Sequence, residues 1–411
     1  MSASKSPRNY VVPLVRDMPR SGIRDFFDIV STRKDVISLG IGEPDFVTPW
    51  RIREAAMFAL DRGATTYTSN RGLLKLRQAI ARYVAQAFQV SYDPETEILI
   101  TVGVSEALDL AIRALVEPGD EVIYHEPCYV SYGPEIALAH ATPVAVETRM
   151  ADGFRLTGQQ VAARVTPRTK ALLLNFPTNP TGATLRRADL ESLAEVARRH
   201  DLIVLADEIY SELTYEGERG SIAALPGMKE RTIFLHGFSK GWAMTGFRLG
   251  YACAPPELSE AMMKIHQYTM LCAPILSQEA ACEALRSPRE TEEMRLAYEQ
   301  RRNLICSALR EMGLPCFKPQ GAFYIFPSIA HLGLTSKEFA LRLLDEENVA
   351  CVPGSAFGAC GEGYLRCAYA TDIEEIKEAM ARLAAFVKRL ARAPAASRPA
   401  AVRKHRAPVP A

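Results

Sequence analysis

The sequence predicts an α/β protein with a large domain, built on a mostly parallel sheet between helices, and a smaller α+β domain. Two observations predict this fold class. Short apolar stretches alternate with helical patterns between about residues 97 and 254, as in parallel sheets of βαβ units. After about Leu285 the alternation gives way to a long helical segment and then to mixed helices and short strands. The chain of 411 residues is long enough for two or three domains.

The N-terminal half begins with an arm containing Pro7, Pro13 and Pro19, followed by a strand that runs into a Gly/Pro turn. A proline opens the first amphipathic helix, as the first turn of a helix allows. The predicted elements are the arm at 1–20, a strand and turn at 38–46, helices at 49–62 and 73–88, a strand at 97–102, a helix at 103–116, strands at 121–124, 143–146, 171–175, 202–206, 232–235 and 249–254, and a helix at 188–200.

The C-terminal part has fewer and shorter strands. Its predicted elements are a helix at 290–312, a strand at 322–326, a helix at 336–346, short strands around 349–352 and 364–370, and a last helix at 373–390. Residues near the N-terminus are expected to complete this smaller domain. The predicted boundaries are 1–45 for the arm and part of the small domain, 46–288 for the large domain, 289–390 for the small domain, and 391–411 for a disordered Ala/Pro/Arg-rich tail.

Composition excludes several classes of protein. The net charge of +1 implies no attraction to nucleic acid or to an anionic membrane. The apolar runs fall short of the roughly 20 residues that cross a bilayer, and the first seven residues lack the apolar core of a signal peptide. The nine cysteines form no Cys-x-x-Cys pair, so we expect reduced thiols in a cytoplasmic protein and no metal site.

Candidate functional residues follow the predicted strands. Gly103, Asn175, Asp207 and Gly237 stand at strand ends, and ligands of parallel sheets bind beyond those ends. Lys240 comes next among apolar and small neighbours. Burial there would lower its pKa and free its amine as a nucleophile, whereas the ordinary alternative is a solvated lysine.

Other candidates also have ordinary alternatives. The turn at 103–106 directs backbone N–H groups toward one point, which suits a phosphate, or Ser105 is a plain N-cap. Asn179 can bind a ligand oxygen or form an Asx turn. Asp207, at the end of a buried strand, must be paired or protonated, or it caps a helix. Gly42 allows close approach of backbone to a ligand, or it lies in a simple tight turn.

Four separated motifs resemble those of the fold-type I pyridoxal-phosphate aminotransferases, class I/II, of the aspartate aminotransferase superfamily. They are Asn-Pro-Thr-Gly at 179–182, Asp-Glu-Ile-Tyr at 207–210, Ser-Lys at 239–240 with Arg248 eight residues on, and Gly-Tyr-Leu-Arg at 363–366. The resemblance spans residues 12–390. The stretches 37–50, 223–231 and 352–370 are most similar to bacterial N-acetyl-LL-diaminopimelate aminotransferases.

The resemblance implies a role for each residue around pyridoxal 5'-phosphate. Lys240 would bind the cofactor covalently and then move a proton. Asp207 would pair with the ring nitrogen, and Tyr210 with Asn179 would bond the phenolic oxygen. Further implied contacts are ring stacking by Tyr129, phosphate binding by Arg248, Val104, Ser105, Glu106, Ser239 and a neighbouring subunit's Tyr67, and substrate carboxylate binding by Arg366 beside Gly42, with Asn175 supporting Arg366.

The implied activity is a homodimeric aminotransferase that moves an amino group between an amino acid and a 2-oxo acid by a ping-pong mechanism. Candidate substrates are N-acetyl-LL-2,6-diaminopimelate, aspartate and aromatic amino acids, with 2-oxoglutarate or glutamate. A pyridoxal-phosphate-dependent C–S β-lyase is the alternative, and a non-catalytic ligand sensor is a remote one. The turn Gly-Val-Ser-Glu lacks a lysine that some relatives use for a distal carboxylate, which leaves Arg71 and Arg20 as candidate readers of the substrate side chain.

Overall fold

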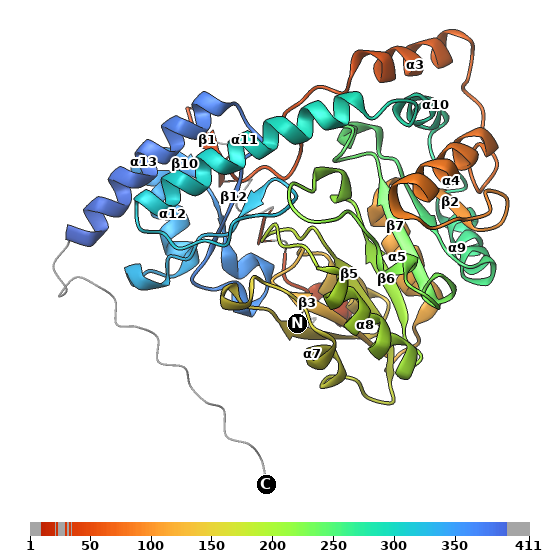
Figure 1. Cartoon of the computed structure of the whole chain (residues 1–411), viewed down its shortest axis with the longest axis horizontal. Coiled ribbons are helices and arrows are strands. Elements are labelled where there is room, and N and C mark those ends of the chain that lie inside the picture. Colours follow the sequence, from red (N-terminus) through yellow and green to blue (C-terminus); the bar gives the residue numbers. More distant parts are fainter. Residues whose placement is uncertain (1–9, 21, 24–28, 31–32, 34, 393–411) are drawn as a thin grey trace, which may run out of the picture.

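The computed structural model of the chain describes residues 10–392 except 21, 24–28, 31–32 and 34. Figure 1 shows a large sheet-containing part on one side and a helix-rich part, coloured blue, on the other. The long helix α11 (Arg289–Glu311) extends between the two parts. The expected arm lies partly, and the expected tail almost wholly, outside the described residues.

The large part contains a sheet of seven strands. They are β2 (Ile98–Thr101), β3 (Glu121–Glu126), β4 (Thr142–Glu147), β5 (Thr169–Asn175), β6 (Ile203–Asp207), β7 (Thr232–Gly237) and β8 (Gly250–Cys253). Their order is β2-β8-β7-β6-β5-β3-β4, and only β8 runs antiparallel to its neighbours. The predicted mostly parallel sheet is therefore confirmed. Because β8 runs backward, the residues before it lie at the same edge as the residues that follow β7.

Helices cover both faces of the sheet because successive strand residues point to opposite sides. Leu235 packs with α5 (Gly103–Leu115), α6 (Tyr132–Leu138) and α9 (Pro256–Thr269). Its neighbour Phe234 packs with α4 (Leu74–Phe88) and α10 (Ile275–Ala284) on the opposite face. Farther along that face, Leu172 and Leu174 pack with α7 (Gly158–Ala162) and α8 (Arg187–Arg199). Both faces of the sheet are therefore buried against helices, as the apolar strands predict.

The smaller part has its own core, formed by three helices around short strands. The elements are α11, α12 (Ser336–Glu347), α13 (Ile373–Arg392), β9 (Tyr324–Ile325), β10 (Val349–Ala350), β11 (Val352–Pro353), β12 (Leu365–Ala368) and β1 (Ile37–Ser38). β1 pairs with β10, so residues Ile37–Ser38 join this part. The remaining described helices are α1 (Pro13–Asp17) and α3 (Trp50–Asp61).

Two of the differences from the predicted bounds concern the segment after β1 and the C-terminal tail. The strand expected to open the strand and turn at 38–46 is confined to Ile37–Ser38. Leu39 still bonds to backbone atoms of Ala350 and Ala368, but beyond it the backbone accepts from side chains: Gly40 O from Arg366, and Gly42 O from Lys240 and Tyr324. Helix α13 continues through Arg392, so the tail predicted from residue 391 begins at least two residues later.

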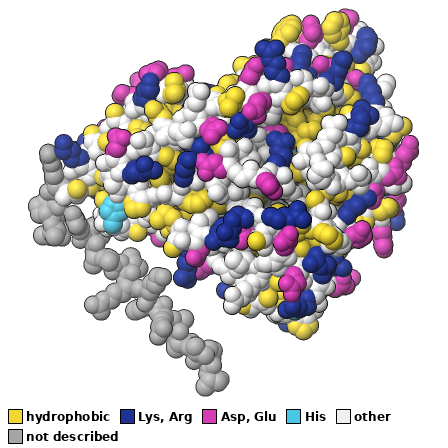
Figure 2. Space-filling view, viewed as in Figure 1, with side chains coloured by type: hydrophobic (Ala, Val, Ile, Leu, Met, Phe, Trp, Pro, Cys, Tyr) yellow, Lys and Arg dark blue, Asp and Glu magenta, His cyan; other side chains and the backbone are white. Residues whose placement is uncertain are grey.

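Other expectations from composition can be compared with the described part of the chain. All nine cysteines are free. The described residues contain no cluster of His, Cys, Asp and Glu that could hold a metal ion, and none of their helices is long and apolar enough to cross a membrane. Figure 2 shows Lys and Arg interspersed with Asp and Glu on the visible face. That face thus carries no large patch of one sign of charge.

Candidate active site

A cavity of about 970 Å³ lies at the sheet edge where the parallel strands end. Both parts of the molecule and the segment after β1 contribute to its wall. The residues lining it include Gly42, Val104, Ser105, Tyr129, Asn175, Asn179, Asp207, Tyr210, Ser239, Lys240, Arg248 and Arg366, together with Ile23, Ile41, Glu43, Leu108, Val130, Ser131, Tyr132, Glu135, Ile209, Thr245, Gly246 and Tyr324. Twelve of the residues predicted from the sequence therefore line one cavity.

Lys240 follows β7 and projects into this cavity. Its Nζ donates a 2.5 Å hydrogen bond to Gly42 O and lies 5.9 Å and 5.8 Å from the ring centroids of Tyr210 and Phe323. Burial lowers the pKa of the Lys240 amine to about 8, and the charge of Glu43 opposes that shift. A substantial fraction of the amine is therefore neutral near physiological pH.

Asp207 ends β6 and is 6% exposed. Its Oδ2 accepts from Tyr132 OH at 2.8 Å, and its Oδ1 accepts from the backbone N–H of Ile209 at 3.2 Å. Burial raises the pKa of the carboxyl to about 6, although both hydrogen bonds oppose the rise. The carboxylate is thus ionised at neutral pH and suits a cationic partner inside the cavity.

The phosphate-binding turn predicted at the start of α5 depends on glycine. Gly103 has φ +78°, and a Cβ there would lie 2.9 Å from Nη2 of Arg248. A Cβ on Gly250 would lie 2.6 Å from the backbone of Gly103 and Val104. These close approaches place the Arg248 guanidinium beside the N-terminus of α5, which favours an anion.

Two expectations about this turn need correction. Ser105 is not the N-cap: Val102 has that position, without a side-chain cap. Glu106 does not line the cavity, because its carboxylate accepts from the backbone N–H of Val102 at 2.5 Å and lies 2.6 Å from Nδ1 of His266. The Glu106 side chain therefore stabilises the turn without contacting the cavity.

Arg366 lies on β12 and is 1% exposed. Its Nη1 donates to Oδ1 of Asn179 at 3.2 Å, and its Nη2 donates to Gly40 O. The guanidinium lies over the rings of Tyr324 and Phe357, and its buried Nε has no hydrogen-bond partner among the described residues. A buried cation with a free donor matches an incoming carboxylate.

The expected support of Arg366 by Asn175 is wrong in detail. Asn175 Nδ2 donates to the backbone O of Asp207 at 3.0 Å, and its Oδ1 accepts from the backbone N–H of Asn179 at 3.3 Å. Asn175 ends β5 beside β6, so it joins adjacent strand ends. The following turn then brings Asn179 to Arg366, instead of directing its side chain into an Asx turn.

Tyrosines line one side of the cavity. The hydroxyls of Tyr210 and Tyr324 are 2.9 Å apart, and burial raises the pKa of Tyr210 well above its ordinary value. The ring of Tyr129 meets that of Tyr132 edge-on, with centroids 5.6 Å apart. The rings of Tyr129 and Tyr210 can thus contact a planar ligand.

Besides Glu106, the predicted residues Tyr67, Arg71 and Arg20 are not brought into the cavity of their own chain. Tyr67 is 81% exposed and does not line the cavity. Arg71 donates to Oε2 of Glu260 at 2.6 Å and to Oγ of Ser259 at 2.8 Å, so its charge is paired elsewhere. Arg20 is exposed and also does not line the cavity.

Several lining residues were missed from the sequence. Tyr324 ends the Gly-Ala-Phe-Tyr sequence at 321–324, within a predicted strand, so its position offered a signal. Tyr132 and Glu135 gave no such signal, because a Tyr and a Glu three residues apart on a short helix normally read as surface or packing residues. Only the position of α6 relative to β6 places them near Asp207.

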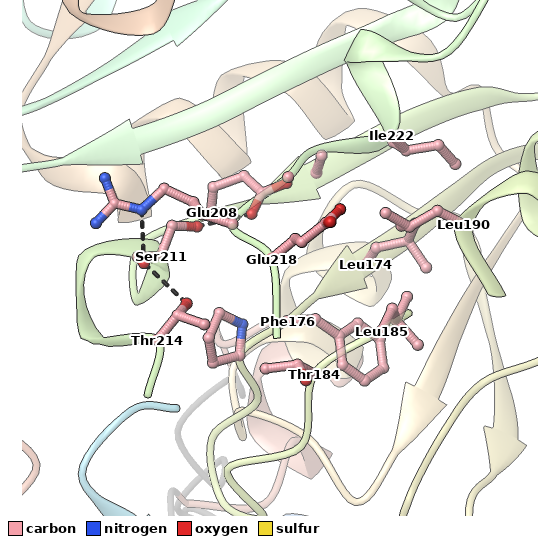
Figure 3. Close-up of a pocket in the computed structure, with 14 residues that line it drawn as sticks. Leu174, Phe176, Thr184, Leu185, Leu190, Glu208, Ser211, Thr214, Glu218 and Ile222 are labelled. Atoms are coloured by element: carbon pink, nitrogen blue, oxygen red, sulfur yellow. Dashed lines mark hydrogen bonds between the residues drawn. The ribbon is translucent and has the colours of Figure 1, made fainter. Parts of the chain in front are cut away.

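A second, much smaller cavity of about 30 Å³ lies among Glu208, Ser211, Thr214, Glu218 and Arg219 (Figure 3). Thr214 Oγ1 and Arg219 Nε both donate to Ser211 O, and Ser211 Oγ donates to Glu208 Oε2 at 2.8 Å. This space holds only one or two waters, so it excludes a ligand of the size that the large cavity admits.

Comparisons with known proteins agree with this geometry. The family model for aminotransferase class I and II matches residues 34–383. The chain is 53% identical over 380 residues to YugH of Bacillus subtilis (strain 168), whose name assigns it provisionally to the aminotransferases; the match covers 92% of this chain and 98% of YugH. It is 44% identical to the "Probable N-acetyl-LL-diaminopimelate aminotransferase" of the same organism, covering 91% and 96%.

A solved structure agrees as well. The aromatic aminotransferase from Pyrococcus horikoshii OT3 is similar to this chain with a TM-score of 0.85 and 47% identity. The similarity covers 89% of this chain and 99% of that one. The likeness therefore includes both the sheet and the smaller part that closes the cavity.

Proposed function

The chain belongs to the class I and II aminotransferases, and we propose that it transfers the amino group of an amino acid with an aromatic or other apolar side chain to a 2-oxo acid by a ping-pong mechanism. The family uses pyridoxal 5'-phosphate. The observation that carries the proposal is the placement of Lys240, Asp207 and Arg366 around one cavity of about 970 Å³.

The residues present fit that cofactor. The cavity offers an amine of lowered pKa, a buried carboxylate, and a glycine turn beside Arg248. We assign Lys240 to covalent attachment, Asp207 to the ring nitrogen, and Tyr129 to the ring face. Bound there, the cofactor supplies an electron sink for the bond-breaking step. Further proposed contacts are the phenolic oxygen with Tyr210 and Asn179, and the phosphate with Val104, Ser105, Ser239, Arg248 and the partner subunit's Tyr67.

The chain's own groups perform the proton chemistry. Lys240 has an amine whose pKa, lowered to about 8 by burial, suits proton removal and return near neutral pH. Asp207 remains ionised at that pH, because its pKa is about 6. A negative carboxylate at this end of the cavity stabilises a positive charge that a ligand carries there.

Arg366 is the proposed site for the α-carboxylate of the substrate. Its free Nε and its position over the Tyr324 ring leave one edge of the guanidinium for a carboxylate, with the Gly42 backbone and Asn175 nearby in the cavity wall. Asn179 orients the opposite edge through its 3.2 Å hydrogen bond. This fixed geometry would hold the Cα–H bond in one direction.

The proposed preference for an apolar side chain comes from the composition of the wall. The described residues that line the cavity include Ile23, Ile41 and Val130, but no basic side chain besides Lys240, Arg248 and Arg366. Those three cations already have proposed partners. A distal carboxylate, as in aspartate, therefore has no dedicated cation within this chain, whereas an aromatic ring meets apolar surface.

We also propose a homodimer. Large hydrophobic side chains are exposed on α3: Trp50 is 58% exposed, Met57 49%, Phe58 57% and Leu60 55%. Isolated exposed apolar residues are common, but a group on one short helix indicates a contact surface. Analytical ultracentrifugation tests for the dimer. Tyr67→Phe should weaken phosphate binding in homodimers of the variant and also in dimers of one variant and one wild-type subunit.

A donor panel tests the proposed activity. The purified enzyme should absorb visible light, and phenylalanine or tyrosine should discharge that band in a single turnover faster than aspartate or N-acetyl-LL-2,6-diaminopimelate. Lys240→Ala should abolish the band. Faster discharge by aspartate would contradict the proposed preference. Release of pyruvate and ammonia from a cysteine conjugate without a 2-oxo acid would instead identify a C–S β-lyase.

A further inference from the structure

Glu135 is an acid in the active-site wall to which no role has been assigned so far. It lies on α6 one turn after Tyr132, so the two side chains share a helix face. Both line the large cavity. Tyr132 reaches Asp207 directly, with 2.8 Å between its hydroxyl and Oδ2. Glu135 is therefore a second carboxyl at the Asp207 end of the cavity.

The carboxyl of Glu135 lacks a partner. Its Oε2 is buried without a hydrogen bond, and within the described part of the chain Glu135 forms no ion pair. Burial, together with the negative charges of Asp109 and Asp207, raises the pKa of this carboxyl to about 8. A buried carboxyl that no cation compensates holds its proton at neutral pH.

The charged groups on the elements packed against α6 do not change this conclusion. On α5, Asp109 pairs with Arg113 at 2.8 Å. On α1, Arg16 pairs with Asp17 at 2.7 Å. On β4, the nearest ionisable side chain belongs to the strand's last residue, the exposed Glu147. The two arginines on these packed elements, Arg16 and Arg113, are thus already paired, and the charge on β4 is negative.

We propose that Glu135 is a positioning residue of the aminotransferase site, which acts through Asp207. In its neutral form it donates a hydrogen bond into the cavity and leaves Asp207 as the single negative charge at that end. When it ionises, a second negative charge appears beside Asp207 and stabilises cations in the cavity more strongly. The proposal rests on the proposed placement of the cofactor ring beside Asp207.

Two matched variants test the proposal. Glu135→Gln keeps the shape of the side chain but is neutral at every pH. Glu208→Gln is the control, because burial also raises the pKa of Glu208 to about 8, yet this carboxyl bonds Ser211 beside the small cavity and does not line the large one. The two variants therefore remove similar acids at different places.

The first measurement is the pH titration of the visible band of the holoenzyme between pH 6 and 10. In the wild type, ionised Glu135 should hold the protonated form of the bound chromophore to higher pH. The apparent pKa should fall by about 0.5 unit or more in Glu135→Gln and stay at the wild-type value in Glu208→Gln. An unchanged titration in Glu135→Gln, or an equal change in both variants, overturns the proposed role.

The second measurement uses the full-length protein without cofactor and does not depend on the proposed function. Folded Glu135 keeps a proton that the unfolded chain loses above about pH 4.3, so wild-type stability falls as pH rises from there to about 8. The unfolding free energy, measured with urea between pH 5 and 8, gives the number of protons released on unfolding. Each variant should release one proton fewer than the wild type. If Glu135→Gln releases as many protons on unfolding as the wild type, Glu135 is already ionised in the folded protein. That result would overturn the proposal, even if the enzyme transfers amino groups.

Discussion

The hydroxyl of Tyr132 donates a 2.8 Å hydrogen bond to Oδ2 of Asp207, and both groups are buried. Tyr132 begins α6, whereas Asp207 ends β6, 75 residues later. The bond counteracts the rise in the Asp207 pKa that burial causes. The hydrogen bond therefore helps to keep Asp207 ionised near neutral pH, where the carboxylate would pair with a positively charged group.

Removal of this bond should shift the acid limb of the reaction. Tyr132→Phe keeps the ring packing but loses the donor, so the pKa of Asp207 should rise above about 6. Because a hydrogen bond to a charged group contributes roughly 1.5–3 kcal/mol, kcat/KM at pH 6.5 should fall about 10-fold or more. The pH profile of kcat/KM should show its acid limb at higher pH. Tyr124→Phe is the control, since Tyr124 bonds Glu126 instead.

Substitution of Asn179 should weaken binding of the amino acid. Asn179→Ala removes the acceptor that orients Nη1 of Arg366, while Gly40 O still holds Nη2. Loss of one bond to a buried guanidinium should raise KM roughly 10-fold, with a smaller change in kcat. Steady-state kinetics with several donors measures both constants. An unchanged KM for every donor would mean that Arg366 needs no orientation by Asn179.

A methyl group at Gly250 should disturb the phosphate turn without touching a ligand. The Cβ of Gly250→Ala would lie 2.6 Å from backbone atoms of Gly103 and Val104, so the turn must move. We expect a loss of about 1–3 kcal/mol in unfolding free energy and weaker cofactor binding. Denaturation and a cofactor titration measure these changes. Gly220→Ala, with open space around its new Cβ, should behave like the wild type.

The active-site lysine should destabilise the protein when no cofactor is bound. Burial lowers the pKa of Lys240 from 10.5 to about 8, so below pH 8 the folded state bears an unfavourable charge, roughly 3 kcal/mol. Lys240→Met should stabilise the cofactor-free protein by an amount approaching that value at pH 7. The difference should shrink as pH rises from 8 to 10.5, where the unfolded wild type also loses its proton. Urea unfolding at several pH values measures it, and the exposed Lys337→Met should have no such effect.

Much of the cavity wall could be predicted because its residues follow strands. Asn175, Asp207 and Lys240 stand directly after apolar stretches, and parallel strands bring their carboxyl ends to one edge. Arg248 could be expected there only if β8 runs backward, which the spacing alone does not reveal. Glu106 lies outside the cavity wall and the candidate Arg71 is paired elsewhere; neither could be predicted, because the sequence does not show that His266 and Glu260 lie beside them.

By itself the sequence determined the alternation of strands and helices, the family resemblance, and the residues that end each strand, because periodicity and motif order are local properties of the chain. The tertiary structure alone decided which side chains meet across long separations. It joined Asn179 to Arg366, set Tyr132 against Asp207, and left Glu135 without a partner in the cavity wall. These relationships depend on how α6, β6 and β12 pack, and packing between distant segments leaves no periodic trace in the sequence.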